Sequence, residues 1–327
     1  MIIHENDFMN ILSCAIKREK AFNYVQNRLE FSLQDIGIEK DCFDDIANIL
    51  LDIYSKKELT GAELSQKISQ FQKEWRPHLN RAYLWDYERL RWEFIATQIL
   101  DKVKTETHDF GRCLDIGCGR GCITESLVAK NYARYATGID SVDFKGEWRE
   151  RRTGTERLSF EYVPVQDFGS WISECKGFDT VFLFYVLHHS TDYWASRTLS
   201  EILRCINKRG QIIVLEDSLF MEEIEEHNQL NKNSQRIITE WRQWAENEHP
   251  YNRSVGFDIQ VILDFVAVQM LAGFKDVNMP FNYKIASEWE NIFKEVGLTV
   301  SQKMNLGFPN KRDIDVPQAV FILKPNA

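Results

Sequence analysis

The sequence has few of the residues that break regular structure. It holds seven prolines and sixteen glycines in 327 residues, with no tract dominated by one residue type. This excludes collagen-like and low-complexity chains. The longest apolar runs, such as residues 180–187, are far shorter than the roughly 20 residues that span a bilayer, so we expect no transmembrane helix and no membrane partner. No basic stretch followed by an apolar one opens the chain, which argues against a secretory signal.

The chain also lacks a cysteine or charge pattern that points to a particular partner. Its seven cysteines are an odd number, and only Cys118 and Cys122 lie close together, with no second pair downstream. We therefore expect no metal site, no disulfide framework and a reducing, cytoplasmic location. The net charge of −9 argues against nucleic acid as a partner, because nucleic-acid binding usually needs a basic face.

Residues 1–78 are expected to be helical, because their apolar residues recur at a spacing of three to four. Asp41 and Thr60 are predicted N-caps, and Gly37 and Gly61 are predicted breaks. This stretch holds no chemical motif. We therefore predict a packing module, through which the chain could form a homodimer.

The following segment, 79–105, is rich in aromatic residues and is predicted to form one long helix. After it, short apolar runs alternate with helical stretches, a pattern typical of a parallel sheet with crossover helices. Strands are expected near 111–116, 134–139, 160–165, 178–184, 211–216, 298–305 and 317–324. Connecting helices are expected near 120–130, 147–153 and 192–207.

An insertion over 217–280 interrupts this alternation. It is predicted to hold a charged helix near 219–247 and an apolar helix near 258–272, since a segment of this size is too long for a simple loop. We expect two domains, a helical module of residues 1–78 and an α/β domain of residues 79–327 that carries the insertion.

The chemical motif is the segment CLDIGCGRG at 113–121. An apolar strand runs into Asp115, then Gly117, Gly119 and Gly121, and then a helix. Such glycines bring backbone N–H groups close to a ligand at a helix N-terminus, which indicates a nucleotide-cofactor site. The NAD fingerprint requires a further glycine where Cys122 stands, so an NAD-linked oxidoreductase is disfavoured.

This motif resembles the first motif of class I S-adenosylmethionine-dependent methyltransferases. The resemblance covers about 110–216 well and 281–327 more loosely. It implies a Rossmann-like, mostly parallel seven-stranded sheet with an antiparallel last strand. It also implies S-adenosylmethionine as the cofactor, with S-adenosylhomocysteine as the product.

Further matches place the cofactor along the strand ends. Asp140 lies 23 residues after Gly117, where an acidic residue reaches ribose hydroxyls. The family resemblance implies that Asp167 accepts a hydrogen bond from the adenine amino group and that Phe168 packs on the adenine ring. The alternative readings are a turn aspartate for Asp140, and a helix cap with a core aromatic for Asp167 and Phe168. The predicted cofactor-binding residues are Asp115, Gly117, Cys118, Gly119, Asp140, Ser141, Gln166, Asp167, Phe168 and Tyr185.

The strand predicted over 178–184 ends in Tyr185 and a Leu-His-His segment that resembles small-molecule methyltransferases. His188 and His189 are candidate general bases, because histidine titrates near neutral pH. In the alternative, one histidine caps the next helix and the other packs under the cofactor. Tyr185 could instead orient the acceptor by hydrogen bonding.

Acceptor contacts are expected from the long helix and the insertion. Aromatic side chains there could enclose a flat or cationic acceptor, or simply pack the insertion on the core. A carboxylate at the end of the fifth predicted strand could receive an amine or hydroxyl, or cap the next helix. The predicted acceptor residues are Tyr83, Trp85, Glu216, Trp241, Trp244 and Tyr283, with Trp92 and Asp217 as further candidates.

The function we expect is methyl transfer to a small molecule, in specialised metabolism. The paired histidines slightly favour O-methylation. The chain has no Pro-Pro pair, which lowers the odds of methylation at planar amines of adenine or glutamine. Two alternatives stay open: an RNA or protein methyltransferase that uses the basic segment 145–157, and a non-catalytic cofactor-binding subunit.

Overall fold

A computed structural model shows a chain with two compact units. The first unit comprises residues 1–89, 219–283 and 306–317, and the second comprises residues 90–218, 284–305 and 318–327. The structure describes residues 5–35, 37–55, 59–87, 92, 95–107, 110–151, 156–217, 253–274, 277, 279–307 and 318–326.

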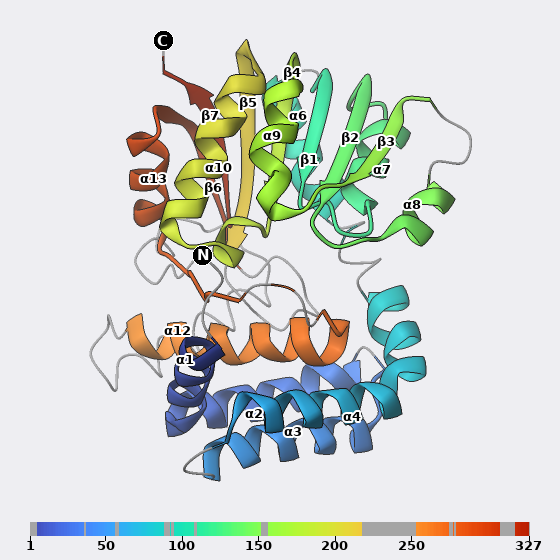
Figure 1. Cartoon of the computed structure of the whole chain (residues 1–327), viewed down its shortest axis with the longest axis vertical. Helices are drawn as coiled ribbons and strands as arrows, with labels where there is room; N and C mark the ends of the chain where they lie inside the picture. Colours follow the sequence, from blue (N-terminus) through green and yellow to red (C-terminus); the bar gives the residue numbers. More distant parts are fainter. Residues whose placement is uncertain are drawn as a thin grey trace. The chain divides into compact units, whose positions relative to one another are not determined.

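The first unit is helical, as predicted for residues 1–78. Helices that are distant in sequence pack together in this unit: α12 contacts both α1 and α2. The apolar helix predicted near 258–272 is confirmed by α12 and the π-helix η6, whereas the charged helix predicted near 219–247 lies outside the described residues. The helices are α1 (Glu5–Lys17), α2 (Glu19–Asp35), α3 (Lys40–Ser55), α4 (Gly61–Leu79), the π-helix η1 (Asn80–Tyr87), α12 (Arg253–Asp264) and η6 (Phe265–Ala272) (Figure 1).

One of the two predicted N-caps is confirmed. Thr60 caps α4: its Oγ1 accepts from the Glu63 backbone N–H, and the Glu63 carboxylate accepts from the Thr60 N–H at 2.9 Å. Asp41 is not a cap, because α3 begins one residue earlier and Asp41 lies in its first turn. There its negative charge still favours the positive end of the helix dipole. Gly37, with a φ of 83°, separates α2 from α3 as predicted.

The described residues of the helix predicted over 79–105 are all helical, although part of the stretch is π-helical. Helix α4 gives way to η1, and η2 (Ile95–Ile99) and α6 (Leu100–Thr107) follow. The stretch passes from one compact unit to the other near residue 89, so its apolar residues serve two cores. Leu84 is buried in the part that belongs to the first unit, and Leu100 in the part that belongs to the second.

The second unit is built on a seven-stranded sheet of order β3-β2-β1-β4-β5-β7-β6. Strands β1 to β5 are parallel to one another, and β7 runs antiparallel to β5. This confirms the predicted fold class. The strands are β1 (Arg112–Ile116), β2 (Tyr135–Asp140), β3 (Leu158–Tyr162), β4 (Phe178–Phe184), β5 (Ile206–Asp217), β6 (Leu298–Gly307) and β7 (Gln318–Pro325).

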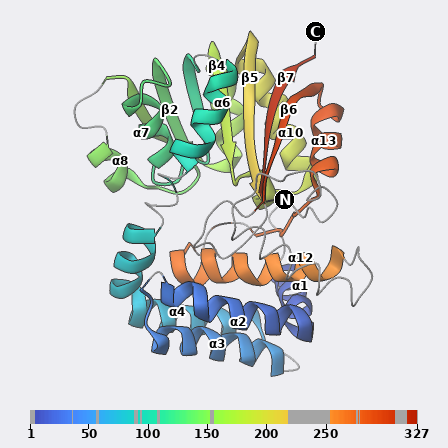
Figure 2. The ribbon, with the colours of Figure 1, turned by 180° about the vertical axis from the view of Figure 1, so that it is seen from behind.

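Helices cover both faces of this sheet. Figure 1 shows α9 (Phe168–Glu174), α10 (Asp192–Cys205) and α13 (Ala286–Glu295) on one face, and Figure 2 shows α6 and α7 (Cys122–Ala129) on the other. The first face buries aliphatic residues of the strands against Leu199 and Trp289. Helix α8 (Lys145–Arg151) connects β2 to β3. No helix of the described residues is long and apolar enough to cross a membrane.

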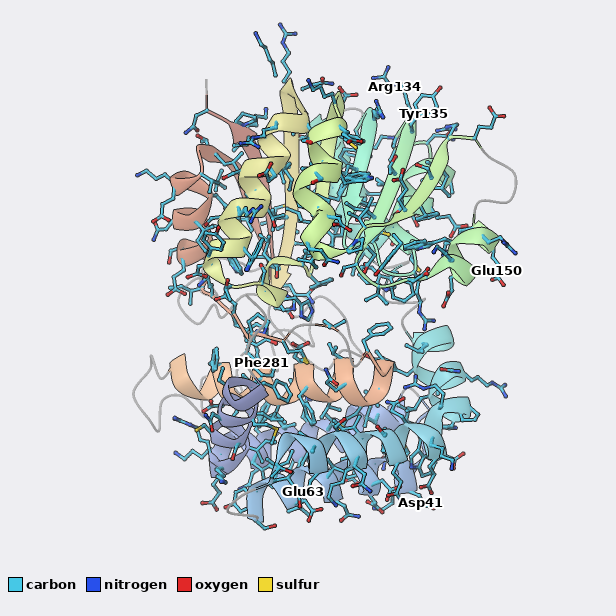
Figure 3. The ribbon with its side chains drawn as sticks, viewed as in Figure 1. Asp41, Glu63, Arg134, Tyr135, Glu150 and Phe281 are labelled. Atoms are coloured by element: carbon cyan, nitrogen blue, oxygen red, sulfur yellow. The ribbon has the colours of Figure 1, made fainter. Side chains whose placement is uncertain are left out.

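Several predicted boundaries in this unit shift by two residues or more. Strand β3 begins at Leu158 and ends at Tyr162, and β5 begins at Ile206, directly after α10. Helix α9, which is seven residues long, was not predicted. Figure 3 labels Arg134 and Tyr135 where β2 begins, at the opposite end of the strands from the glycine-rich motif. Both are exposed there.

Candidate functional site

The glycine-rich loop, residues 117–121, joins β1 to α7 at the carboxyl ends of the parallel strands. Gly117 and Gly121 have φ values of 71° and 82°, which disfavour any side chain. A Cβ at Gly117 would lie 2.5 Å from the Val186 side chain, and one at Gly121 would lie 2.4 Å from the Phe160 ring. By contrast, no atom of the described residues lies within 4 Å of a Cβ built at Gly119. The loop is thus packed at both ends and open in the middle.

Asp140 ends β2 beside this loop. Its Oδ2 accepts from the Gly119 N–H and its Oδ1 from the Val142 N–H, both at 2.8 Å. Burial raises the pKa of Asp140, while these backbone donors lower it. Each oxygen keeps a second lone pair, so the carboxylate can still accept from two neighbouring hydroxyls. Ser141, the next residue, is exposed.

Asp115 lies beneath the loop, 2% exposed, and its Oδ2 accepts from Thr124 Oγ1 at 2.6 Å. Burial raises the pKa of Asp115 to about 7, and the Asp140 carboxylate adds to the rise. Burial also raises the pKa of the Cys118 thiol, helped by both carboxylates. Near neutral pH this corner therefore holds a carboxyl group that is partly protonated and a thiol that is not ionised.

The segment after β3 forms a single 3₁₀ turn, Val165–Asp167, that leads into α9. Gln166 and Asp167 are exposed and Phe168 is half-buried. Asp167 occupies the N-cap position of α9, but its side chain makes no capping hydrogen bond. Phe168 packs against the core beneath the sheet. Both the cofactor role and the structural alternative for this pair remain predictions.

The turn after β4 is held by Glu216 of β5. Its Oε1 accepts from the N–H groups of Val186, at 2.9 Å, and Leu187, at 2.6 Å. Its Oε2 lies 2.6 Å from Nδ1 of His188, and both side chains are buried. Tyr185 has a φ of 59°, which is strained for a residue with a bulky side chain, and its N–H donates to Leu215 O. These bonds keep the turn in one conformation despite that strain.

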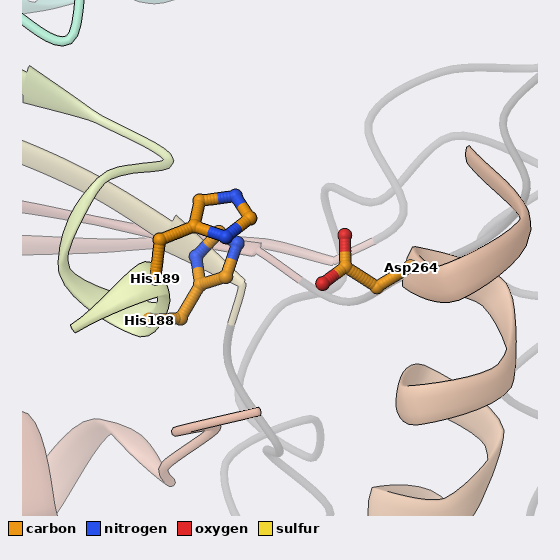
Figure 4. Close-up of side chains that lie close together, drawn as sticks. All are labelled: His188, His189 and Asp264. Atoms are coloured by element: carbon orange, nitrogen blue, oxygen red, sulfur yellow. The ribbon is translucent and has the colours of Figure 1, made fainter. Parts of the chain in front are cut away.

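His188 and His189 lie in a 3₁₀ turn, Leu187–His189, with ring centroids 4.2 Å apart (Figure 4). His188 is buried and His189 is half-buried. The N-cap position of the following helix α10 is occupied by Thr191 and not by a histidine. The Tyr185 ring meets Trp92 edge to face, with centroids 5.9 Å apart.

The remaining predicted acceptor residues are scattered through the chain. Tyr83 is buried in η1, and Tyr283 is buried and donates from its hydroxyl to Asp264 Oδ2 at 2.5 Å. Figure 4 labels Asp264 at the end of α12. Trp241 and Trp244 lie outside the described residues, as does the side chain of Trp85. Glu216 was also predicted to contact the acceptor; in the structure its carboxylate accepts from the turn after β4.

The basic segment 145–157 is largely used within the protein. Arg151 donates to Arg120 O at 2.6 Å and pairs with Glu125. Arg157 donates to Ala133 O and Arg134 O at 2.6 and 2.9 Å. Of the remaining cations, Lys145 pairs with Asp143 and Arg149 is exposed, whereas Arg152 lies outside the described residues. Arg151 and Arg157, among the described cations of this segment, are thus held by contacts within the protein.

Sequence reasoning missed two features of the site. Trp148 of α8 donates from Nε1 to Gly119 O at 2.8 Å, and Thr124 bonds Asp115. The only signal for Trp148 was a single apolar residue within a charged stretch. Glu216 and His188 were both singled out, but their pairing across two strands has no signature in the sequence.

Comparison with known proteins identifies the family and the fold. A family model described as a methyltransferase domain matches residues 87–303. N,N-8-amino-8-demethyl-D-riboflavin dimethyltransferase from Streptomyces davawensis has a similar fold, with a TM-score of 0.52, 15% identity, and coverage of 89% of this chain and 71% of that chain. No curated protein matches this chain.

Two other solved structures give lower TM-scores. Mitomycin 7-O-methyltransferase shares 16% identity over 87% of this chain and 67% of its own, with a TM-score of 0.47. A 1,6-didemethyltoxoflavin-N1-methyltransferase from Burkholderia thailandensis shares 13% identity over 84% of this chain and 93% of its own, with a TM-score of 0.45.

Proposed function

Because the chain belongs to the methyltransferase-domain family, we propose that it transfers a methyl group to a small-molecule acceptor, with O-methylation favoured. Its cofactor is S-adenosylmethionine. The observation that carries the proposal is the buried pairing of Glu216 with His188, at the carboxyl ends of β4 and β5. Ligands of such sheets bind beyond these strand ends.

The cofactor fits the residues around the glycine-rich loop. The space beside Gly119 is open, and the second lone pairs of Asp140 can accept from ribose hydroxyls. Exposed Asp167 and half-buried Phe168 are proposed to meet the adenine. The other residues proposed to bind the cofactor are Asp115, Gly117, Cys118, Ser141, Gln166 and Tyr185.

The bound cofactor supplies a methyl group already activated as a sulfonium. The protein's tasks are then to align the acceptor, bring it close and exclude water. A general base is needed only where the acceptor must lose a proton, as a hydroxyl does.

His188 is the base that the geometry favours. The Glu216 carboxylate, 2.6 Å from Nδ1, stabilises the tautomer with the proton on Nδ1 and leaves the lone pair on Nε2. The same carboxylate stabilises the imidazolium that forms when the ring takes a proton. His189 and Tyr185 are proposed to orient the acceptor. Glu216 accepts hydrogen bonds from Val186, Leu187 and His188. We therefore propose that it orients His188 and does not contact the acceptor.

The rest of the assignment rests on the sequence. We propose that Tyr83, Trp85, Trp241, Trp244 and Tyr283 provide acceptor contacts, and that the chain can form a homodimer through the N-terminal helices of residues 1–78. We also propose a cytoplasmic location, because the seven cysteines are an odd number without a paired spacing.

Thermal unfolding with S-adenosylhomocysteine, and separately with NAD, tests the cofactor assignment. A ligand at about 100 times its Kd adds roughly 2.7 kcal/mol to the stability, which is a shift of a few degrees. We expect the melting temperature to rise with S-adenosylhomocysteine alone. The rise should be lost in Asp140→Ala and kept in the control Asp143→Ala, because Asp143 is an exposed aspartate three residues further along the chain. A shift with NAD alone would overturn the proposal.

Turnover is tested with radiolabelled S-adenosylmethionine and a panel of phenols, amines and carboxylic acids. We expect transfer to a phenol or another hydroxyl compound, with little dependence on salt. Transfer to RNA that weakens steeply with salt would favour the RNA methyltransferase instead. Cofactor binding without transfer to any member of the panel or to nucleic acid would favour the non-catalytic subunit.

A further inference from the structure

Helix α8 holds the glycine-rich loop from outside. The indole Nε1 of Trp148 donates to Gly119 O at 2.8 Å, and Nε of Arg151 donates to Arg120 O at 2.6 Å. Two consecutive carbonyls of the loop are therefore fixed by side chains that lie one helical turn apart on the same face of α8. Glu150, labelled on α8 in Figure 3, is exposed instead.

Both side chains are themselves held in place. Trp148 is 2% exposed and stacks on Phe160 of β3, with ring centroids 5.7 Å apart and an interplanar angle of 5°. Arg151 also pairs with Glu125 of α7 and donates to Cys122 Sγ at 3.1 Å. The donors are thus positioned before any ligand arrives.

Because the peptide bond is planar, the hydrogen bonds to these carbonyls also fix the direction of the following N–H groups. In a trans peptide the C=O and the following N–H point in opposite directions, so the bond to Gly119 O directs the Arg120 N–H away from α8. On the other side of Gly119, its own N–H donates to Asp140 Oδ2 at 2.8 Å. Trp148 and Asp140 therefore act on the two peptide units that flank one residue, Gly119, where the loop is open.

We propose that Trp148 and Arg151 are positioning residues for the cofactor loop, an inference that rests on the proposed function. They hold the peptide units after Gly119 and Arg120 so that the loop and Asp140 keep their ligand-binding arrangement without the ligand. A preorganised loop loses less conformational freedom on binding and so binds more tightly.

Calorimetric titration of the full chain with S-adenosylhomocysteine tests this. Trp148→Phe keeps an aromatic ring on Phe160 and removes only the N–H donor, so we expect the Kd to rise about five- to tenfold, the equivalent of one hydrogen bond. The matched control is Trp75→Phe, which removes an indole bond of 2.7 Å to Asp45 in the first unit. Its Kd should equal that of the unaltered chain.

A second pair of variants guards against misfolding. Arg151→Lys keeps a positive charge for Glu125 but loses the directed Nε donor, and we expect a three- to tenfold rise in Kd. Its control is Arg157→Lys, because Arg157 also donates to backbone carbonyls, those of Ala133 and Arg134, which lie outside the loop. Melting temperatures without ligand show that each pair is compared in the folded state.

A double-mutant cycle with Asp140→Asn separates positioning from general destabilisation. If Trp148 and Asp140 act through Gly119, the double variant loses less affinity than the product of the single losses. A Kd for Trp148→Phe and Arg151→Lys equal to that of their controls, or losses that multiply, would overturn the inference. Absence of binding by the unaltered chain would instead overturn the proposed function.

Discussion

Glu216 at the end of β5 lies 2.6 Å from Nδ1 of His188, in the turn after β4, and both side chains are buried. A buried carboxylate is costly unless hydrogen bonds satisfy it. Here the two backbone N–H groups of Val186 and Leu187 complete the set. One residue thus fixes a strained turn and orients a candidate base.

Replacing Glu216 by Gln should separate these two tasks. The amide oxygen can still accept from the backbone, but the amide N–H₂ opposes Nδ1 and favours the tautomer with the proton on Nε2. We expect methyl transfer to fall about 10²- to 10⁴-fold, the range for general-base catalysis, while the Kd for S-adenosylhomocysteine changes less than threefold. Rates and calorimetry give the two numbers, and NMR of the imidazole nitrogens identifies the tautomer.

Glu290→Gln provides the control, because Glu290 pairs with Lys303 and has no part in the proposed site. An unchanged rate in Glu216→Gln would remove His188 as the base. Equal losses of rate and of cofactor affinity would show that Glu216 supports the turn and nothing more.

Replacing Gly117 by Ala should destabilise the protein by about 2–4 kcal/mol. The added Cβ would lie 2.5 Å from the Val186 side chain, and the φ of 71° adds strain. Gly37 has a φ of 83°, and no atom of the described residues lies within 4 Å of its Cβ position. Gly37→Ala should therefore cost only the backbone strain, about 1 kcal/mol. Urea unfolding measures both.

The close contact can be tested separately. Val186→Ala in the Gly117→Ala background should recover part of the loss, because it removes the clashing methyl groups but not the strain. If the two glycine variants are equally destabilised, the contact between the loop and the turn after β4 does not contribute.

The raised pKa of Asp115 should make the stability of the protein depend on pH. Burial raises its pKa to about 7, from about 4 in an unfolded chain. Between these values the folded protein holds a proton that the unfolded chain has released, so the free energy of unfolding falls as pH rises and is flat above about 7. From pH 5 to pH 8 we expect the wild type to lose about 2–3 kcal/mol relative to Asp115→Asn.

Urea unfolding of both proteins at the two pH values gives this difference. Burial raises the pKa of Asp140, and that of Asp258 to about 6, but both residues are present in both proteins and their effects cancel to first order. A difference that grows in favour of the wild type as pH rises would contradict the assigned direction.

The capping box of α4 should contribute measurably to the first unit. Thr60→Ala removes the Oγ1 that accepts from the Glu63 N–H, and we expect a loss of about 1 kcal/mol. Thr191 occupies the N-cap position of α10 without a side-chain capping bond, so Thr191→Ala should change stability by less than about 0.5 kcal/mol. Denaturant unfolding followed by circular dichroism compares them, and equal losses would refute the assignment.

Much of the second unit was predictable because its elements have strong local patterns. The strand predicted over 178–184 coincides with β4, because a strand buried on both faces is mostly apolar and shows no alternation of polar residues. The loop 117–121 was found because backbone geometry demands glycine there. Helix α9, by contrast, is one short segment, and Asp41 was mistaken for a cap because its residue type suits both the cap and the first turn.

The sequence by itself determined the order of strands and helices and the glycine-rich loop, because these depend on residue spacing within a few turns of chain. Only the tertiary structure decided which distant groups meet. His188 and Glu216 stand 28 residues apart and pair because β4 and β5 are neighbours in register. Trp148 reaches Gly119, and α12 joins α1, for the same reason: contacts between distant segments depend on how whole elements pack, which no local pattern records.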